Sequence, residues 1–254
     1  MAENLKEAGG LKEAGGKVRL YVTAPLGGDA TVAPDEGQAH YLLHVMRAKA
    51  GDRVALFNGR DGEWLAELAE VKKRAVTLRC LKQTAAQTGV PDLWLAFAPI
   101  KKTPSDYLVQ KAAELGVRAL LPVFTRRTIV TRINRERMTA NVVEAAEQSA
   151  RLDVPDVREG VSLDRLLADW PQDRRLYFCD EGGDAVPLAD AARGHTGPTA
   201  ILTGPEGGFD PAERAALRER AFVTPVTLGP RILRADTAAL AALAIWQSVA
   251  GDWV

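Results

Sequence analysis

Residues 202–213 read LTGPEGGFDPAE, and residues 228–240 read LGPRILRADTAAL. Each stretch starts at the end of an apolar segment typical of a buried strand and leads into a helix-like pattern. Glycines at such a turn let the backbone approach a ligand closely and leave N–H groups free to bind it. Each turn alone is also explained by an ordinary surface connection. Two such turns at the carboxyl edge of one sheet, where open α/β sheets bind ligands, predict a ligand pocket.

The first turn, GPEGG at residues 204–208, differs from the common nucleotide-binding loops. It does not match GxGxxG, and no acidic residue about twenty positions further on ends a following strand, so the dinucleotide fingerprint fails. No Gly-Lys-Ser/Thr triplet follows, so the turn is not a P-loop either. A nucleotide-dependent α/β enzyme with an unusual glycine loop stays open as an alternative.

Predicted strands and helices alternate through the C-terminal part of the chain. The alternation predicts a largely parallel sheet with helices on both faces. The strands are expected at residues 93–98, 120–124, 175–179, 199–202 and 223–228.

Helix boundaries are also marked in this part of the chain. One helix is expected to begin with Thr103 as its N-cap and Pro104 at its first position, and to end before Gly116. Another is expected from residue 210 to about residue 220. The last helix, about residues 236–250, is apolar nearly all round, which is typical of burial in a core or against a second subunit.

The N-terminal part predicts a small β-barrel domain over residues 18–82. A polar stretch at residues 83–91 separates it from a second domain, residues 92–254. The sequence LKEAGG occurs at residues 5–10 and again at 11–16, and two such short units do not make a solenoid. We expect residues 1–17 to be a flexible extension. The barrel strands are expected at residues 18–22, 53–57, 64–71 and 75–81, with one helix at about 35–47.

The composition excludes several classes of protein. Among 254 residues, 33 basic and 33 acidic side chains give a net charge of zero, which argues against a general nucleic-acid coat. Cys80 and Cys179 lack CxxC spacing, so neither a disulfide framework nor a zinc site is expected. We expect the protein in a reducing cytoplasm. No signal peptide is visible, and the longest apolar run, residues 238–246, is about half of a membrane span.

Charge is unevenly distributed along the chain. Residues 99–137 contain nine basic and three acidic side chains, whereas residues 138–192 contain five arginines and twelve acidic side chains. A local excess of positive charge is what binding to phosphates requires. A solvated charged face explains the same pattern equally well, so charge alone does not decide between the two.

His40 and His44 are four residues apart on the predicted N-terminal helix, a spacing that can place two imidazoles on one metal ion. No third ligand is evident, and the remaining histidine, His195, belongs to the other domain. No metal site is expected, and packing or RNA contact is the favoured interpretation of the pair.

The two glycine-rich turns and several further segments resemble one known family. GPEGGF precedes LGPRILR by about twenty residues. The segments at residues 110–117 (QKAAELGV) and 144–155 are similar to two helical motifs of that family, and residues 40–47 and 51–59 are similar to its N-terminal domain. Together these segments resemble the RsmE-type 16S rRNA uridine-N3 methyltransferases, of the SPOUT class.

The resemblance implies a SPOUT-type α/β fold whose C-terminal chain is tied in a trefoil knot, preceded by a PUA-like RNA-binding β-barrel. Periodicity alone predicts only an open doubly wound sheet. It also implies S-adenosyl-L-methionine as the cofactor, 16S rRNA or the assembled small ribosomal subunit as the partner, and a homodimer. The cofactor is expected to contact the two turns and the start of the last helix, at Leu202, Thr203, Gly204, Glu206, Gly207, Gly208, Leu228, Gly229, Ile232, Leu233 and Thr237.

The resemblance further implies roles for individual side chains. Loss of the N3 proton of uridine leaves charge on the ring, which a cation stabilises. Arg234 is expected to provide that cation, with Asp236 orienting it or accepting the proton. The family commonly has Thr-Glu where this chain has Ala235-Asp236, which shortens the reach of the carboxylate. RNA is expected to contact His40, Arg47, Lys101, Lys102, Lys111, Arg126, Arg127, Arg151 and Arg231.

A third class of protein stays open as an alternative. The N-terminal barrel and the basic region would also suit a non-catalytic RNA-binding protein of ribosome assembly. Such a protein needs neither glycine-rich turn, so the presence of both favours the enzyme.

Overall fold

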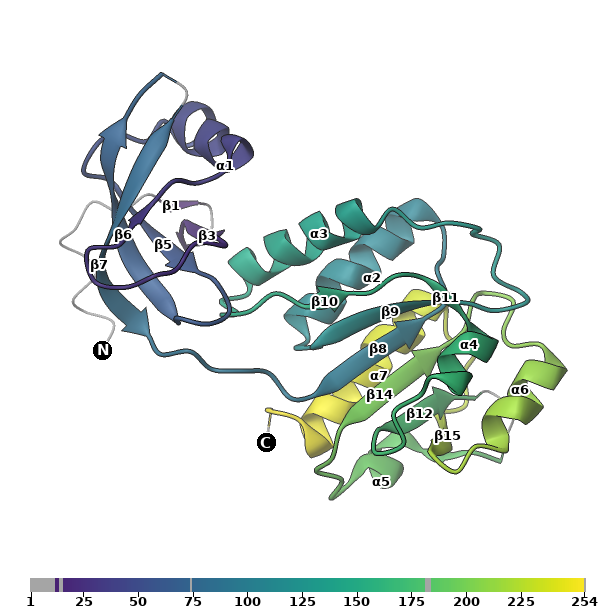
Figure 1. Ribbon diagram of the computed structural model, residues 1–254. Helices are drawn as coiled ribbons and strands as arrows, with labels where there is room; N and C mark the ends of the chain where they lie inside the picture. The colour runs from purple at the N-terminus through teal and green to yellow at the C-terminus, as the bar shows by residue number, and fades with distance from the viewer. Residues whose placement is uncertain (1–11, 14–15, 74, 181–183, 254) are drawn as a thin grey trace. The chain divides into compact units, whose positions relative to one another are not determined.

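The computed structural model describes residues 12–13, 16–73, 75–180 and 184–253 (Figure 1). The chain divides into two compact units. Unit 1 contains the residues up to Gly89 together with Ala146–Asp153, and unit 2 contains Val90–Ala145 and Val154–Val254. The sequence-based division placed residues 146–153 in the second domain, whereas their contacts are with the first.

Unit 1 is built on a five-stranded sheet in which β3 is parallel to β5 and the other pairs are antiparallel. Four of its strands were predicted; the short β4 was not. Alternate residues of these strands face one side, as the two-residue period of a strand requires, and form the apolar core of the unit. In order across the sheet, the strands are β3 (Arg19–Tyr21), β5 (Arg53–Phe57), β6 (Glu63–Val71), β7 (Val76–Ala85) and β4 (Thr31–Val32).

The predicted helix at residues 35–47 is in fact two segments. Asp35 caps α1 (Glu36–His40) with a capping box, and the chain continues as a π-helix, η2 (Tyr41–Val45). The wider turn arises because the Met46 N–H donates to the Tyr41 carbonyl, five residues back. Periodicity cannot distinguish one turn of π-helix from an α-helix, so the sequence predicted one continuous element.

The predicted extension at residues 1–17 lies largely outside the described residues, and most of the LKEAGG repeat lies there too. Of that segment, β1 (Lys12–Glu13) and β2 (Gly16–Lys17) are described, and they pair antiparallel. The flexible extension stays a prediction.

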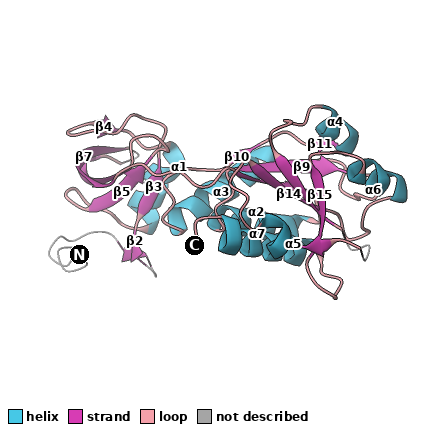
Figure 2. Cartoon of the chain, turned by 90° about the horizontal axis from the view of Figure 1, so that it is seen from below, coloured by secondary structure: helices cyan, strands magenta, loops and turns pink. Residues whose placement is uncertain are grey.

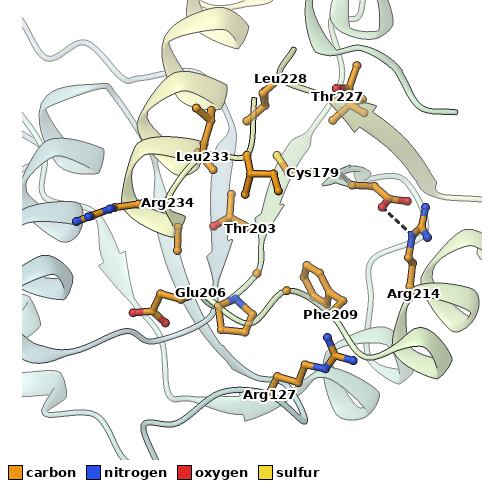
Figure 3. A pocket seen from close by; sticks show the side chains of 18 of the residues that line it. Arg127, Cys179, Thr203, Glu206, Phe209, Arg214, Thr227, Leu228, Leu233 and Arg234 are labelled. Carbon is orange, nitrogen blue, oxygen red and sulfur yellow. Dashed lines mark hydrogen bonds and ion pairs between the residues drawn. The ribbon is translucent and has the colours of Figure 1, made fainter. Parts of the chain in front are cut away.

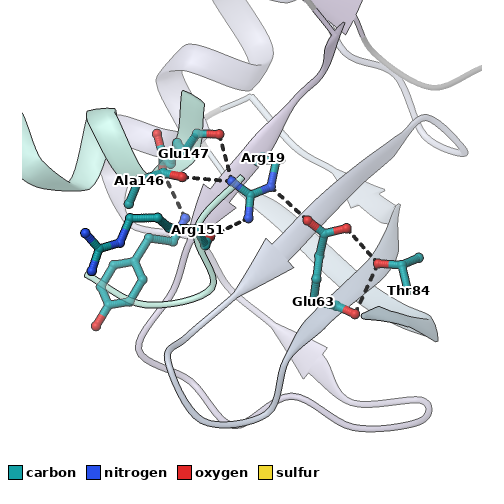
Figure 4. A network of polar contacts seen from close by, with 7 residues as sticks. Arg19, Glu63, Thr84, Ala146, Glu147 and Arg151 are labelled. Atoms are coloured by element: carbon teal, nitrogen blue, oxygen red, sulfur yellow. Dashed lines mark hydrogen bonds and ion pairs between the residues drawn. The ribbon is translucent and has the colours of Figure 1, made fainter. Parts of the chain in front are cut away.

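Arg19 on β3 connects the sheet of unit 1 to residues 146–153 (Figure 4). Its guanidinium donates to the backbone carbonyl oxygens of Ala146 at 2.8 Å, Glu147 at 2.9 Å and Arg151 at 2.6 Å. Its Nε donates to a carboxylate oxygen of Glu63 at 2.8 Å, and the two side chains are only 8% and 13% exposed. Carbonyls in the last turn of a helix lack intrahelical partners, so Arg19 caps the end of α3 (Arg135–Gln148).

Unit 2 is built on a sheet in which every described pairing is parallel. The five predicted strands are all present, at its centre, which confirms the predicted fold class. The order across the sheet is β10 (Asp156–Val157), β9 (Ala119–Phe124), β8 (Leu93–Phe97), β14 (Thr199–Thr203), β12 (Arg175–Cys179), β15 (Val223–Thr227) and β13 (Val186–Pro187), with β11 (Val161–Ser162) also paired to β9.

Helices cover both faces of this sheet (Figure 2). On β14, Ile201 contributes to the core on one face and its neighbours Ala200 and Leu202 to the core on the other. All three are fully buried, which is why the strand reads as a continuous apolar run. One face carries α2 (Lys102–Glu114), α3, α5 (Leu188–Ala192) and α7 (Ala235–Ala250); the other carries α4 (Leu163–Ala168) and α6 (Pro211–Arg218).

One helix start was predicted wrongly. The N-cap of α2 is Lys101, so Pro104 is the third helical residue, and Thr103 lies inside the helix. The first turn tolerates proline because the N–H groups there lack intrahelical partners in any case. The predicted end is correct, since Leu115 is the C-cap and Gly116 follows with a positive φ of 82°.

Two further expectations concern the chain as a whole. No helix within the described residues is long and apolar enough to cross a membrane. The trefoil knot that the resemblance implies stays a prediction.

Candidate active site

A cavity of about 820 Å³ lies in unit 2 (Figure 3). Its walls are the turn that follows β14, the turn that follows β15, and the residues that end β12. Because neighbouring parallel strands all end at the same edge, the fold brings together three segments that are 20 or more residues apart in sequence. The cavity therefore lies at the carboxyl edge of the sheet, where the two glycine-rich turns predicted a ligand pocket.

The turn after β14 requires glycine at its first position. A Cβ on Gly204 would lie 2.6 Å from the Cε2 atom of Phe209, which is closer than atoms can pack. The Phe209 ring is fixed in turn by an edge-to-face contact with Phe178 on β12, with ring centroids 4.9 Å apart. Gly208 has a positive φ of 67°, which few other residues adopt. The turn thus presents backbone, rather than side chains, to part of the cavity.

The start of α6 holds this turn in place. Asp210 is the N-cap and Glu213 completes the capping box, at the start of the helix expected from residue 210. Hydrogen bonds from the Ala212 N–H and, secondarily, the nearby Arg126 guanidinium lower the pKa of Asp210. The buried Glu213 also accepts a hydrogen bond from the Arg126 backbone N–H at 2.8 Å. The loop after β9 is therefore attached to the glycine-rich turn.

Arg127 makes a second attachment between that loop and the turn. Its NH1 donates to the Gly207 carbonyl oxygen at 3.0 Å, and a Cβ on Gly207 would lie 3.6 Å from the Arg127 Cβ. The arginine also lines the cavity. One of the predicted RNA-binding side chains thus touches the predicted cofactor turn directly.

The turn after β15 supplies the opposite wall of the cavity. Leu228 and Leu233 contribute apolar surface, and Gly229 has a φ of 107° with open space where a Cβ would be. Ile232 is 87% exposed. Arg234 is the N-cap of α7, but its side chain makes no capping hydrogen bond.

Asp236 lies in the first turn of α7, where the helix dipole favours a negative charge. Its Oδ1 accepts from the Thr237 backbone N–H at 2.8 Å. It does not line the cavity, and no hydrogen bond between it and Arg234 occurs in the described chain.

Most of the predicted cofactor residues line the cavity: Thr203, Gly204, Glu206, Gly208, Leu228, Gly229, Ile232 and Leu233. Arg234, Arg127 and Arg231 line it as well. Of the others, Leu202 is fully buried in the core, and Gly207 and Thr237 lie outside the lining. The roles assigned to these residues stay predictions.

Some of the predicted RNA-binding residues of unit 2 do not line the cavity, and these lie at the surface of the unit. Lys101 is exposed, Lys111 pairs with Glu114 at 2.6 Å, and Arg126 pairs with Asp210 at 3.0 Å. Exposed pairs of this kind are worth little, so these cations can exchange partners for phosphates. The side chain of Lys102 lies outside the described part of the structure.

The predicted RNA-binding residues of unit 1 differ in exposure. His40 is exposed on α1, with its ring centroid 4.6 Å from that of His44, and Arg47 is also exposed and has a positive φ of 53°. Arg151 has a side chain only 6% exposed and pairs with Asp153. Its buried guanidinium cannot contact RNA without leaving this position. No group of three potential metal ligands occurs among the described residues.

Sequence reasoning missed a charged cluster on the cavity wall. Asp180 and Asp184, near the end of β12, line the cavity together with Arg214 and Arg218 of α6. The two carboxylates are 30 or more positions from the two arginines and no motif connects them, so only the fold reveals the cluster. Cys179, at the end of β12, also lines the cavity, and burial raises the pKa of its thiol to about 12.

Comparisons with known families and relatives agree with this site. A family model described as an RNA methyltransferase domain matches residues 88–247, and one described as an RNA methyltransferase PUA domain matches residues 34–80. The ribosomal RNA small subunit methyltransferase E of Rickettsia conorii is 31% identical over 228 residues, which cover 89% of this chain and 93% of that protein. The protein of the same name from Bacillus subtilis is 31% identical, covering 81% and 85%.

Two solved structures share the fold over nearly their whole length. One is a ribosomal RNA small subunit methyltransferase E from Neisseria gonorrhoeae bound to S-adenosyl methionine; it has a TM-score of 0.86 and 30% identity, covering 94% of this chain and 100% of that one. The other is a putative methyltransferase from Legionella pneumophila in complex with the bound cofactor SAM, with a TM-score of 0.83 and 28% identity, covering 93% and 99%.

The two family models, together with the parallel sheet and the cavity at its carboxyl edge, place the chain in the class of RNA methyltransferases. Within that class, the chain belongs to the ribosomal RNA small subunit methyltransferase E family. The family suggested by the two glycine-rich turns is thereby confirmed.

Proposed function

We propose that this protein transfers a methyl group from S-adenosylmethionine to N3 of one uridine in 16S rRNA. The observation that carries the proposal is the cavity itself, enclosed by the two turns that resemble the family's motifs. Relatives of the same fold have been solved with that cofactor bound.

The cavity suits a nucleoside cofactor. Its volume of about 820 Å³ falls within the usual range of small-molecule sites, about 300–1,000 Å³. Leu228, Leu233 and Phe209 offer apolar surface for a flat base, while the glycine-rich turns bring backbone close enough to hydrogen-bond its edges. When bound there, S-adenosylmethionine supplies an electrophilic methyl group.

The chain's own contribution to the reaction is placement and charge. Uridine N3 carries a proton that must leave, and the negative charge that develops on the ring needs a nearby cation. Arg234 suits this role because the residue lines the cavity and its exposed guanidinium hydrogen-bonds to no described residue. Asp236, two residues further on, is assigned to orient Arg234 or to accept the proton. It neither lines the cavity nor hydrogen-bonds to Arg234 in this structure, so either role requires its side chain to turn toward the cavity.

The substrate base must be accessible to this cavity. N3 lies on the base-pairing edge, so the target uridine has to be unpaired or turned out of its helix. Arg127 and Arg231 line the cavity, and we assign them to hold the flanking phosphates. Unit 1, whose PUA domain match covers residues 34–80, would add a second RNA contact.

The proposed reaction predicts a modification at one position of the rRNA. Methylation at N3 blocks base pairing, so reverse transcriptase stops there. We expect primer extension on 16S rRNA from a deletion strain to lose one stop at a uridine, and the wild-type gene to restore it. An unchanged pattern of stops would refute the assignment to N3 of 16S rRNA.

We also propose that the protein acts as a homodimer. On α7 the residues Leu240, Ala241, Ala244 and Ile245 are only half-buried, although they are apolar, and Ile232 nearby in sequence is 87% exposed. An apolar face of this kind is typical of a subunit interface. Size-exclusion chromatography with light scattering should give a mass of twice 27.4 kDa; a monomer at micromolar concentration would count against the dimer.

A further inference from the structure

Two arginines of α6 meet one buried carboxylate at the end of β12. Arg214 and Arg218 are four residues apart and therefore lie on the same face of the helix. The Nε of Arg214 donates to Oδ1 of Asp180 at 2.7 Å, and the Nε of Arg218 donates to Oδ2 at 2.7 Å. The Asp180 side chain is only 2% exposed. A buried carboxylate needs such partners, so its position and theirs are fixed together.

The two arginines differ in how many of their guanidinium nitrogens donate hydrogen bonds within the protein. Arg218 uses all three nitrogens, since its NH1 and NH2 also bind Asp184 at 2.9 and 2.6 Å. Each nitrogen of its guanidinium is therefore already bound to a carboxylate of the protein. Arg214 uses only Nε, and in the described part of the chain no acceptor takes a hydrogen bond from its NH1 or NH2. Its side chain is 37% exposed and lines the cavity.

The cavity carries an excess of positive charge. Five arginines and three carboxylates line it: Arg127, Arg214, Arg218, Arg231, Arg234, Asp180, Asp184 and Glu206. Arg214 and Arg234 lie on opposite sides of the pocket (Figure 3). Because Arg214 is held by Asp180 at Nε, its two terminal nitrogens are oriented in advance, which is the arrangement that recognises a carboxylate bidentately.

We propose that Arg214 binds the carboxylate at the amino-acid end of S-adenosylmethionine, with Asp180 as the residue that orients Arg214. The inference rests on the proposed function. The cofactor has a single anionic group, that carboxylate, beside a positively charged sulfonium and ammonium. The Arg214 guanidinium, held at Nε and with NH1 and NH2 left to donate, matches that one group. Selection for the complete cofactor over a bare nucleoside would follow from this contact.

Two ligands distinguish the proposed contact between Arg214 and the carboxylate from the other interactions in the pocket. S-adenosylhomocysteine keeps the amino-acid end, and 5′-methylthioadenosine has the same adenosine and sulfur without it. We expect calorimetric titration of the wild-type protein to show tighter binding of the first. In Arg214→Met the affinity for S-adenosylhomocysteine should fall about 10- to 100-fold, as for a lost charged hydrogen bond, while that for 5′-methylthioadenosine stays within about twofold.

Two further variants and one stability measurement complete the test. Arg220→Met changes an exposed arginine that follows α6 and is absent from the cavity lining, and it should alter neither affinity. Arg214→Lys keeps the positive charge but lacks the Nε hydrogen bond to Asp180. Its affinity for S-adenosylhomocysteine should lie between those of the wild-type protein and Arg214→Met. Thermal unfolding shows whether each variant is folded.

The possible outcomes distinguish this inference from the function on which it rests. If Arg214→Met weakens both ligands equally, or neither, the carboxylate contact is wrong. A loss confined to RNA affinity would also overturn it and assign Arg214 to phosphate binding. If the wild-type protein binds neither ligand, the proposed function itself fails.

Discussion

Arg234→Ala is expected to lower the rate of methyl transfer at saturating substrate by at least about 100-fold, the usual cost of removing a group that stabilises developing charge. Cofactor affinity should stay within about tenfold of wild type. The fold should be unaffected, because the Arg234 side chain is exposed and makes no capping hydrogen bond. Single-turnover kinetics and calorimetric titration of S-adenosylhomocysteine measure the two quantities separately.

Arg231→Ala is the matched control for that variant. Arg231 belongs to the same turn, lines the same cavity and is exposed, but is assigned to RNA rather than to the reacting base. Its loss should raise KM for RNA and leave the single-turnover rate within a few-fold of wild type. If Arg234→Ala instead lowers cofactor affinity and rate by the same factor, Arg234 belongs to cofactor binding and the chemical role assigned to it is wrong.

Arg19→Met is expected to have the largest effect on stability, about 3–5 kcal/mol for unit 1, as when one partner is removed from a buried ion pair. The change leaves the Glu63 carboxylate, 13% exposed, without its guanidinium. It also removes the donors to the carbonyls of Ala146, Glu147 and Arg151. Because the chain has two compact units, hydrogen exchange of the amides in unit 1 reports this loss better than one global transition.

Arg79→Met provides the comparison for Arg19→Met within the same sheet. Arg79 on β7 pairs with Glu67 on β6, but its side chain is 50% exposed. Pairs exposed to this degree contribute about 0–1 kcal/mol, so this variant should leave the exchange rates almost unchanged. Comparable destabilisation by the two substitutions would show that Arg19 is not the connection that holds residues 146–153 to the sheet.

Local signals in the sequence predicted most of the fold. The parallel sheet followed from apolar strands alternating with helices, and the start of α6 followed from Asp210, Pro211 and Glu213, which act within four residues of one another. The start of α2 was predicted wrongly because Thr103-Pro104 has the residue types of a helix start. The observed N-cap, Lys101, lies two residues earlier and makes no side-chain capping hydrogen bond. The π-helical turn at Tyr41–Val45 has no local signature at all.

The candidate site was predictable only in part for a related reason. The two glycine-rich turns carry recognisable residue types, and the cavity is where the sheet order places them. The pairing of Asp180 with Arg214 and Arg218 joins positions 34 and 38 residues apart, and no spacing rule connects them. Burial of Arg151 likewise depends on contacts made within unit 1, which its sequence neighbours do not reveal.

The central claim is that this chain methylates small-subunit rRNA, and transfer of a tritiated methyl group tests it most directly. Small subunits from a strain lacking the protein are incubated with the purified wild-type chain and labelled S-adenosylmethionine. We predict incorporation approaching one methyl group per subunit, strongly reduced with Arg234→Ala and absent with subunits from the wild-type strain. Binding of the same subunits without any incorporation would contradict the claim and identify the protein as a non-catalytic RNA-binding factor.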